Sequence, residues 1–192
     1  MKSVPLLLKT LRLPLLVALT AAIVSGCGFQ LRGTSPVPAA LQPLAVDCPN
    51  SLPARFCESV REQLSLGGIE LHPIETADYQ LKLRNYSQDR RASAITAQAS
   101  AAEYVLRHTV TIELLTANQI PLIAATDLTA SETYRYDETN VLAKQREEEE
   151  LQQQLGDRLA QQVIFRLVPM TQERIAAALE AHSANTKPSE SP

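Results

Sequence analysis

The sequence predicts an α+β domain, a two-layer sandwich in which a mostly antiparallel, four- to five-stranded sheet carries two helices on one face. Polar and apolar residues alternate along three consecutive segments, residues 79–94, 102–116 and 120–136, with the period of two that is typical of half-buried strands. Short connections between these segments favour antiparallel pairing. From residue 139 the apolar period changes to about four, which predicts a long helix. We therefore expect the order β-α-β-β-β-β-α.

The elements before the long strands are short. Residues 44–48 form an apolar strand candidate, and residues 53–66 place Phe56, Val60 and Leu64 at helical spacing before Gly67 and Gly68 end the helix. Residues 69–71 are a short second strand that ends at His72 and Pro73.

Alternation assigns the long-strand residues to two faces. In the first long strand Tyr79, Leu81 and Leu83 share the apolar face. Lys82 and Arg84 share the opposite, polar side, as does Arg107 in the next strand. We expect one face of the sheet to be covered by the helices and the other to remain open.

The C-terminal part is expected to be helical and then disordered. The long helix should end near Pro169, and a short helix is predicted at residues 173–181. The composition of residues 183–192 is typical of a disordered tail. The expected organisation is therefore a signal peptide at 1–26, an acylated N-terminus and tether at 27–40, one α/β domain at 41–182, and the tail at 183–192.

The N-terminal segment has the pattern of an export signal for a lipoprotein. Basic residues precede an apolar run, residues 13–24, that is too short to span a bilayer. Val24, Ser25 and Gly26 then lead into Cys27, the order that a lipoprotein signal peptidase accepts. We expect cleavage before Cys27, acylation of this residue, and anchoring to a membrane without crossing it. Ordinary secretion with an incidental cysteine is the less favoured alternative.

Charge argues against nucleic-acid binding. Three of the 18 Lys and Arg residues and none of the 21 acidic residues lie within residues 1–26, so the processed chain carries a net charge of about −6. Nucleic-acid-binding domains are typically basic. Gly28, rather than an aspartate, follows Cys27, which is typical of lipoproteins sorted to the outer membrane.

The sequence offers no recognisable catalytic or metal-binding set. The chain has three histidines, and no GxSxG, HExxH or glycine-rich phosphate loop is present. His108 falls on an apolar strand face, which favours a hydrogen-bonded core or edge histidine over a catalytic one. We expect neither an enzyme, nor a cofactor, nor a metal site.

Two cysteines remain after acylation of Cys27. In an oxidising compartment the even count favours a disulfide between Cys48 and Cys57. Two separate buried thiols are the alternative.

Charged residues outside these motifs leave two questions open. The acidic run at residues 147–150 is expected to be a solvated helix surface rather than an acidic docking patch, because four successive residues wrap around a helix. The second question concerns the basic residues that alternation places on or near the polar side of the sheet. They either cluster into a site for a phosphorylated ligand or belong to an ordinary charged sheet face. These residues are Lys82, Arg84, Arg90, Arg91 and Arg107.

Several short motifs resemble the LptE family of lipopolysaccharide-assembly lipoproteins. The N-terminal stretch at residues 27–34 reads Cys-Gly-Phe-Gln-Leu-Arg-Gly-Thr, and residues 61–64 lead into residues 68–71 as in the first helix and second strand of the family. Residues 102–104 resemble its Ala-Glu-Tyr strand opening, and residues 142–144 its Leu-Ala-Lys element. The resemblance spans residues 27–167 in the family's order.

The resemblance implies a non-enzymatic partner of LptD, an outer-membrane β-barrel. It implies a periplasmic-facing, lipid-anchored plug inside the barrel in a 1:1 complex, which assists barrel assembly and binds lipopolysaccharide. Lys144 carries over from the family's lipopolysaccharide contacts. In the loop at residues 95–100 the sequence departs from the family, because it has no basic residue there, and Arg90 and Arg91 are the nearest. A free-standing carrier of lipids or envelope components is the alternative function.

Overall fold

The computed structural model describes residues 37–95 and 101–186. The predicted signal peptide, Cys27, the tether up to residue 36, residues 96–100 and the last six residues lie outside the described residues. The α+β class is confirmed, with four strands in the order β1-β2-β3-β4. Among the described residues no helix is long and apolar enough to cross a membrane.

Three long antiparallel strands dominate the sheet. They are β2 (Tyr79–Ile95), β3 (Ala101–Thr116) and β4 (Pro121–Arg135), and β1 (Leu44–Asp47) runs parallel to β2 at the edge. The predicted strand at residues 69–71 is wrong as a strand, because only Leu71 pairs, in a single bridge to Leu44. Four residues between the turn at Gly68 and Pro73 leave too little extended chain for a longer ladder.

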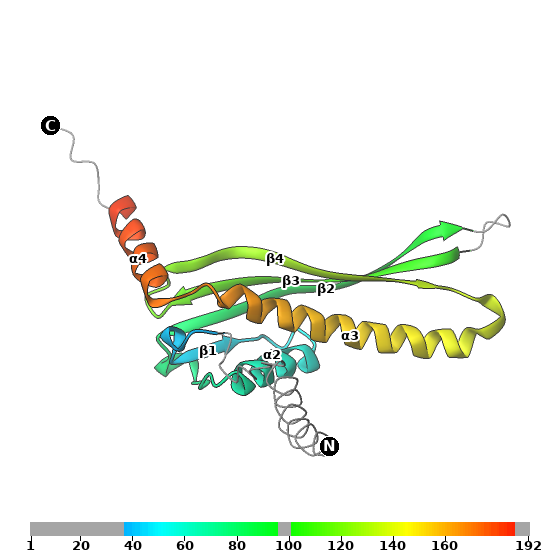
Figure 1. Ribbon diagram of the computed structural model, residues 1–192, viewed down its shortest axis with the longest axis horizontal. Coiled ribbons are helices and arrows are strands. Elements are labelled where there is room, and N and C mark those ends of the chain that lie inside the picture. The colour runs from blue at the N-terminus through cyan, green and yellow to red at the C-terminus, as the bar shows by residue number, and fades with distance from the viewer. Residues whose placement is uncertain (1–36, 96–100, 187–192) are drawn as a thin grey trace, which may run out of the picture. The chain divides into compact units, whose positions relative to one another are not determined.

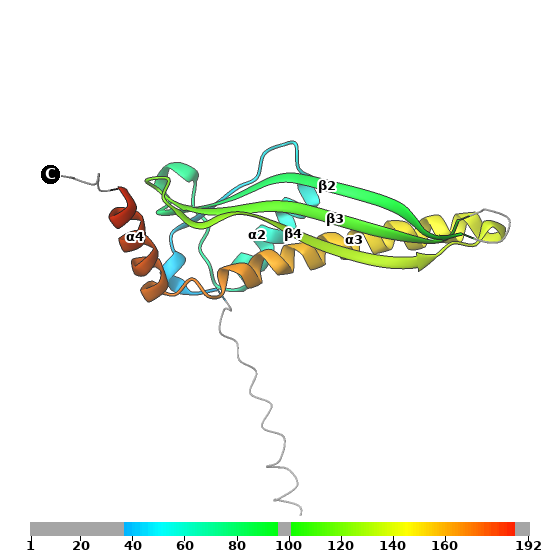
Figure 2. The ribbon, with the colours of Figure 1, turned by 90° about the horizontal axis from the view of Figure 1, so that it is seen from above.

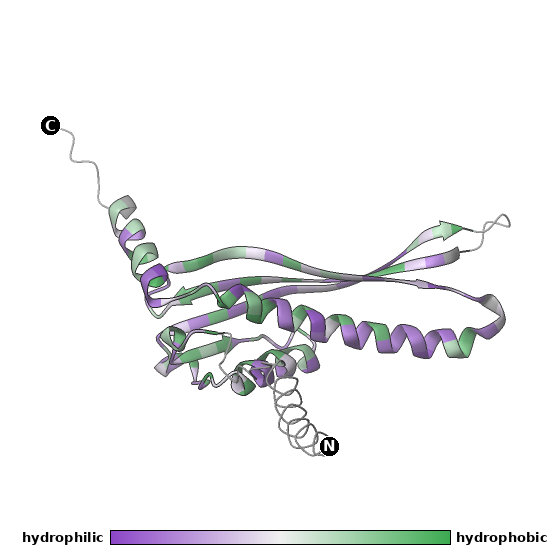
Figure 3. Ribbon diagram, viewed as in Figure 1, coloured by the Kyte–Doolittle hydropathy of each residue, from purple (hydrophilic) through white to green (hydrophobic). Residues whose placement is uncertain are grey.

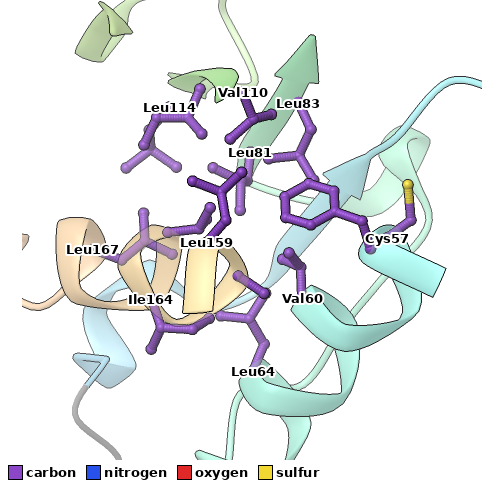
Figure 4. Close-up of a cluster of buried hydrophobic side chains, with 14 of the residues drawn as sticks. Cys57, Val60, Leu64, Leu81, Leu83, Val110, Leu114, Leu159, Ile164 and Leu167 are labelled. Carbon is purple, nitrogen blue, oxygen red and sulfur yellow. The ribbon is translucent and has the colours of Figure 1, made fainter. Parts of the chain in front are cut away.

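Helices α2 (Ala54–Leu66) and α3 (Val141–Leu167) lie on the same side of the sheet, as Figures 1 and 2 show. The half of α3 that ends at Leu167 packs against both α2 and the sheet. Figure 4 shows Leu159 of α3 close to Leu81 of β2, and Ile164 and Leu167 belong to the same buried cluster. Each buried leucine contributes roughly 1.5–3 kcal/mol through loss of apolar surface from water, so this region is the core of the domain.

The half of α3 that begins at Val141 is different. Figure 3 shows mostly hydrophilic residues along it, and its first large, fully buried side chain is Leu155. Leu151 is only partly buried against the core. Apolar packing therefore contributes little here, and polar contacts hold this half to the sheet.

Two segment boundaries differ from expectation. Val37 is 2% exposed and residues Ala39–Leu41 form a 3-10 helix, η1, so the domain begins before residue 41 and takes in the end of the predicted tether. Helix α4 (Gln172–Thr186) continues into the segment predicted to be a disordered tail. Ile175 is buried in the core, which gives α4 a tertiary contact that the composition of its last residues does not reveal.

Candidate functional site

A bulge in β2 decides which basic side chains share a face. Arg84 pairs with Thr111 and Ser87 with Thr109, so β2 has one residue more than β3 between these pairs. Asn85 takes up the irregularity with a φ of 53°, a left-handed conformation that asparagine tolerates better than most residues. Because side chains alternate between faces, one extra residue exchanges the faces of all residues that follow. Arg90 therefore faces α3, although Lys82 and Arg84 do not.

Arg90 lies in a group that we call the distal cluster, formed by Arg90, Tyr104, Tyr134 and Glu148. The Arg90 guanidinium carbon lies 3.6 Å from the centre of the Tyr104 ring, a cation–π arrangement. Its Nε donates to the Tyr134 hydroxyl at 3.1 Å and lies 3.2 Å from a Glu148 carboxylate oxygen. Tyr134 in turn donates to the same oxygen at 2.5 Å. The distal cluster thus joins β2, β3 and β4 to the polar half of α3.

The cluster alters the acidity of its members. Burial and the hydrogen bond to Glu148 raise the pKa of Tyr134 to about 12, although the hydrogen bond from Arg90 opposes this shift. Burial would lower the pKa of Arg90, but the hydrogen bond to Tyr134 and the charge of Glu148 outweigh it and raise the pKa. At neutral pH the cluster therefore contains a protonated tyrosine and a compensated ion pair.

Lys144 lies next to this cluster along the helix. It precedes Glu148 by four residues, so both side chains lie on one face of α3, about 6 Å apart along its axis. The Lys144 ammonium lies 2.6 Å from a Glu147 carboxylate oxygen, and its side chain is 21% exposed. Lys144 and Arg90 are thus the two predicted ligand-binding cations that the structure brings to one region.

The remaining basic residues lie on the opposite side of the sheet, which we call the polar face. It is rich in hydrogen-bonded threonines, such as Thr111, which donates to Asp127 at 2.6 Å. Lys82 donates to the Gln119 side chain at 2.9 Å. Arg84 forms an ion pair with Asp47, the last residue of β1. These contacts favour a structural role for Arg84.

Arg91 and Arg107 are also on the polar face. Asp89 pairs with Arg107 across the ladder, and the Asp89 carboxylate lies 2.6 Å from Nε of Arg91. Lys82 pairs with Glu113, six residues from Arg107 along β3, a separation of about 20 Å. The six predicted cations therefore do not converge on one site.

The acidic run at residues 147–150 was predicted to be a solvated surface, and Glu148 departs from this prediction. Its side chain is 20% exposed and bonds to both Arg90 and Tyr134. Helical periodicity could not identify the contacts of Glu148. They depend on the change of face in β2 and on the position of α3 along the sheet, and the helical period reports neither.

The structure pairs the two predicted cysteines and buries His108. Cys48 and Cys57 form a disulfide with Cα atoms 6.1 Å apart, which ties the end of β1 to α2. His108 is 1% exposed, and its Nδ1 lies 2.9 Å from the Tyr86 hydroxyl. Burial lowers the pKa of His108, and its position agrees with the prediction of a hydrogen-bonded core or edge histidine.

A cleft of about 240 Å³ lies between α2, β2 and α3, and Phe56, Tyr86 and Gly156 contribute to its lining. Glu149 and Asp157 also line it together with a single cation, Arg55, so the lining carries a net negative charge that disfavours an anion. Within residues 37–95 and 101–186 no group of three or more His, Cys, Asp or Glu side chains is placed to hold a metal ion.

The fold and these contacts define a class: a two-layer α+β domain, with charged and aromatic side chains clustered between sheet and helix and a second, polar sheet face. Solved structures share this fold. A minor lipoprotein from Acinetobacter baumannii is 25% identical with a TM-score of 0.55, and 66% of this chain and 90% of that chain are covered. Lipoprotein B from Nitrosomonas europaea has a TM-score of 0.62 at 18% identity, over 81% and 97% of the two chains.

The family follows from the sequence comparisons. The family model LptE, described as lipopolysaccharide-assembly, matches residues 41–167. The LPS-assembly lipoprotein LptE of Pectobacterium atrosepticum is 30% identical over 80% of this chain and 83% of its own length. That of Yersinia enterocolitica is 29% identical over 88% and 81%. The chain belongs to the LptE family, as its motifs indicated.

Proposed function

We propose that this protein is an outer-membrane lipoprotein, acylated at Cys27, that takes part in lipopolysaccharide assembly as the plug of an LptD-like β-barrel. The observation that carries the proposal is the extent of the family match, because residues 41–167 contain all four strands, α2 and α3. The sheet and both helices that cover it therefore fall within the region matched by the lipopolysaccharide-assembly family.

The polar face suits a position inside a barrel. The lumen of a large outer-membrane barrel is polar, so a plug needs hydrogen-bonding side chains rather than a broad apolar patch. Thr109 and Thr129, with hydroxyl oxygens 3.3 Å apart, and Asp127 present such groups on β3 and β4. A non-enzymatic role agrees with this arrangement.

Lipopolysaccharide binding is assigned to the region of Lys144 and Arg90. Phosphate groups accept strong charge-assisted hydrogen bonds from ammonium and guanidinium groups. Glu147 and Glu148 compensate these cations in the free protein, so a phosphate has to compete with a carboxylate for each of them. The Arg90 side chain is 39% exposed and that of Lys144 is 21% exposed, so both cations are within reach of a ligand in solution.

Co-purification tests the plug. The acylated full chain, extracted from outer membranes in mild detergent, is expected to carry a large β-barrel protein at a constant 1:1 ratio. A monomer without a barrel would contradict the proposal and favour a free-standing carrier.

The same assay tests the anchor. If acylation serves delivery more than retention, Cys27→Ala behind an ordinary signal peptide should reduce the yield of complex without abolishing it. Complete loss would show that the anchor is required for the complex itself.

A further inference from the structure

A groove at the C-terminal end of α3 lies apart from the distal cluster and Lys144, and it includes residues beyond position 167, where the family match ends. It has a volume of about 510 Å³ and lies between the start of β4, the end of α3 and α4; we call it the α4 groove. Its lining combines six apolar residues with two arginines: Leu122, Ile123, Arg166, Pro169, Met170, Arg174, Ala177 and Ala178.

The charge of the groove is of one sign. No carboxylate is among the described residues that line it, and within the described part of the chain neither Arg166 nor Arg174 takes part in an ion pair. The nearest acid in sequence, Glu173, accepts a hydrogen bond from the Thr171 side chain. This contrasts with Arg84 and Arg90, which both have carboxylate partners.

Large apolar side chains are exposed beside the groove. Phe165, which precedes the groove residue Arg166, is 58% exposed on the last turn of α3, and Val168, which directly follows the helix, is 36% exposed. An exposed aromatic ring next to unpaired cations is the combination found where proteins lie on a membrane surface, with the ring among the acyl chains and the cations at anionic headgroups.

The groove is at the end of the sheet where the chain enters the domain. Leu44, Tyr79 and Thr116 form one row across β1, β2 and β3, and Leu115 pairs with Pro121, the residue before Leu122 of the groove. Figure 1 shows α4 at this end. Cys27 and Val37 are ten positions apart in sequence, and a chain of ten residues extends at most about 35 Å. An acylated Cys27 would therefore keep Val37 within about 35 Å of a bilayer.

We propose that the α4 groove docks on the membrane surface, where Arg166 and Arg174 bind the phosphates of anionic phospholipids and Phe165 enters the interface. The proposal rests on the acylation of Cys27, which belongs to the proposed function, but it requires neither the barrel nor lipopolysaccharide. The occupant is an anionic phospholipid because a neutral apolar ligand would leave two guanidinium groups without a partner.

Fluorescence quenching tests this docking directly. The chain has no tryptophan, so F165W provides a unique reporter in the acylated full chain, reconstituted in vesicles without any barrel. With brominated phosphatidylglycerol in phosphatidylcholine vesicles, we expect at least twofold quenching. L142W is the matched reporter, since Leu142 is 75% exposed and lies about 35 Å away along α3; its fluorescence should be unchanged.

Charge reversal completes the test. R166E/R174E in the F165W background should remove most of the quenching, whereas R55E/R61E, which changes the net charge equally on exposed positions of α2, should not. Absent quenching in a chain that floats with the vesicles would overturn the docking site. Equal quenching by brominated phosphatidylcholine alone would overturn its anionic specificity. A chain that does not float with the vesicles would overturn both the acyl anchor and the docking. If the chain shows quenching but no barrel co-purifies with it, only the proposed role as a plug is contradicted.

Discussion

Tyr134 donates a hydrogen bond to Glu148, and Arg90 lies against the same carboxylate oxygen. This contact joins the edge strand β4 to the half of α3 that has few buried apolar side chains. It therefore positions Lys144, one turn earlier on the helix, relative to the sheet.

Removing the Tyr134 hydroxyl should weaken this attachment. Y134F deletes the bonds to Glu148 and Arg90, and we expect the free energy of unfolding to fall by about 2 kcal/mol, because bonds to charged groups contribute about 1.5–3 kcal/mol. Urea denaturation measures the change. Y136F is the control, since Tyr136 packs edge-on against Tyr104 and its ring is retained. Equal losses in both variants would contradict the assignment.

The pKa of Tyr134 predicts a dependence of stability on pH. Its folded value, about 12, is above the value of 10.0 for an unperturbed tyrosine. A raised folded pKa adds stability that is complete below pH 10 and is lost as the pH rises towards 12. The stability difference between wild type and Y134F should therefore shrink from pH 10 to pH 12. A difference that grows over this interval would show that the hydroxyl is not protonated in the folded cluster.

Much of the fold follows from the periodicity of the sequence, but the set of residues that form the distal cluster does not. Alternation correctly placed Leu81 and Leu83 in the core and Lys82 and Arg84 opposite them, because these residues precede the bulge. Extending the same parity to Arg90 would have placed it on the wrong side. The sequence carries only Asn85 as a local signal of the extra residue, and many asparagines occur in strands without a bulge.

Short segments were harder to predict than the long strands, for a reason unrelated to the bulge. Tertiary contacts decide them: Val37 is buried by the domain, Leu71 pairs only with Leu44, and Ile175 secures α4. Local composition cannot report such contacts.

The disulfide should contribute measurably to stability. Cys48 and Cys57 are nine positions apart, and loop-closure entropy for such a small loop gives roughly 2.5 kcal/mol. We expect C48A/C57A to lose about this amount in urea denaturation, alanine being chosen because Cys57 is buried. Dithiothreitol should lower the stability of the wild type and leave the double variant unchanged. Sensitivity of the variant to the reductant would mean that another effect had been measured.

Lys144 should affect ligand affinity more than stability. K144E turns a favourable contact with a phosphate into a repulsion, so we expect lipopolysaccharide binding, measured at fixed ionic strength, to weaken by about tenfold. K82E is the matched control, because Lys82 has a comparable charge on the polar face and bonds only to Gln119. If K82E weakens binding as much as K144E, the ligand responds to net charge and not to the region around Arg90.

Asn85 links the backbone to the site and can be tested by conformational preference. At a φ of 53° glycine meets no steric penalty, whereas a β-branched residue does. N85G should therefore change stability by less than about 0.5 kcal/mol, and N85V should lose roughly 1–3 kcal/mol through backbone strain. The loss of the bond from Asn85 to Thr111 is common to both variants and cancels in the comparison.

The bulge at Asn85 also turns Arg90 towards Glu148. In the N85V background, Y134F should therefore lower the free energy of unfolding by less than it does in the wild type. A double-mutant cycle measures this coupling, and strict additivity of N85V and Y134F would show that the distal cluster forms independently of the bulge.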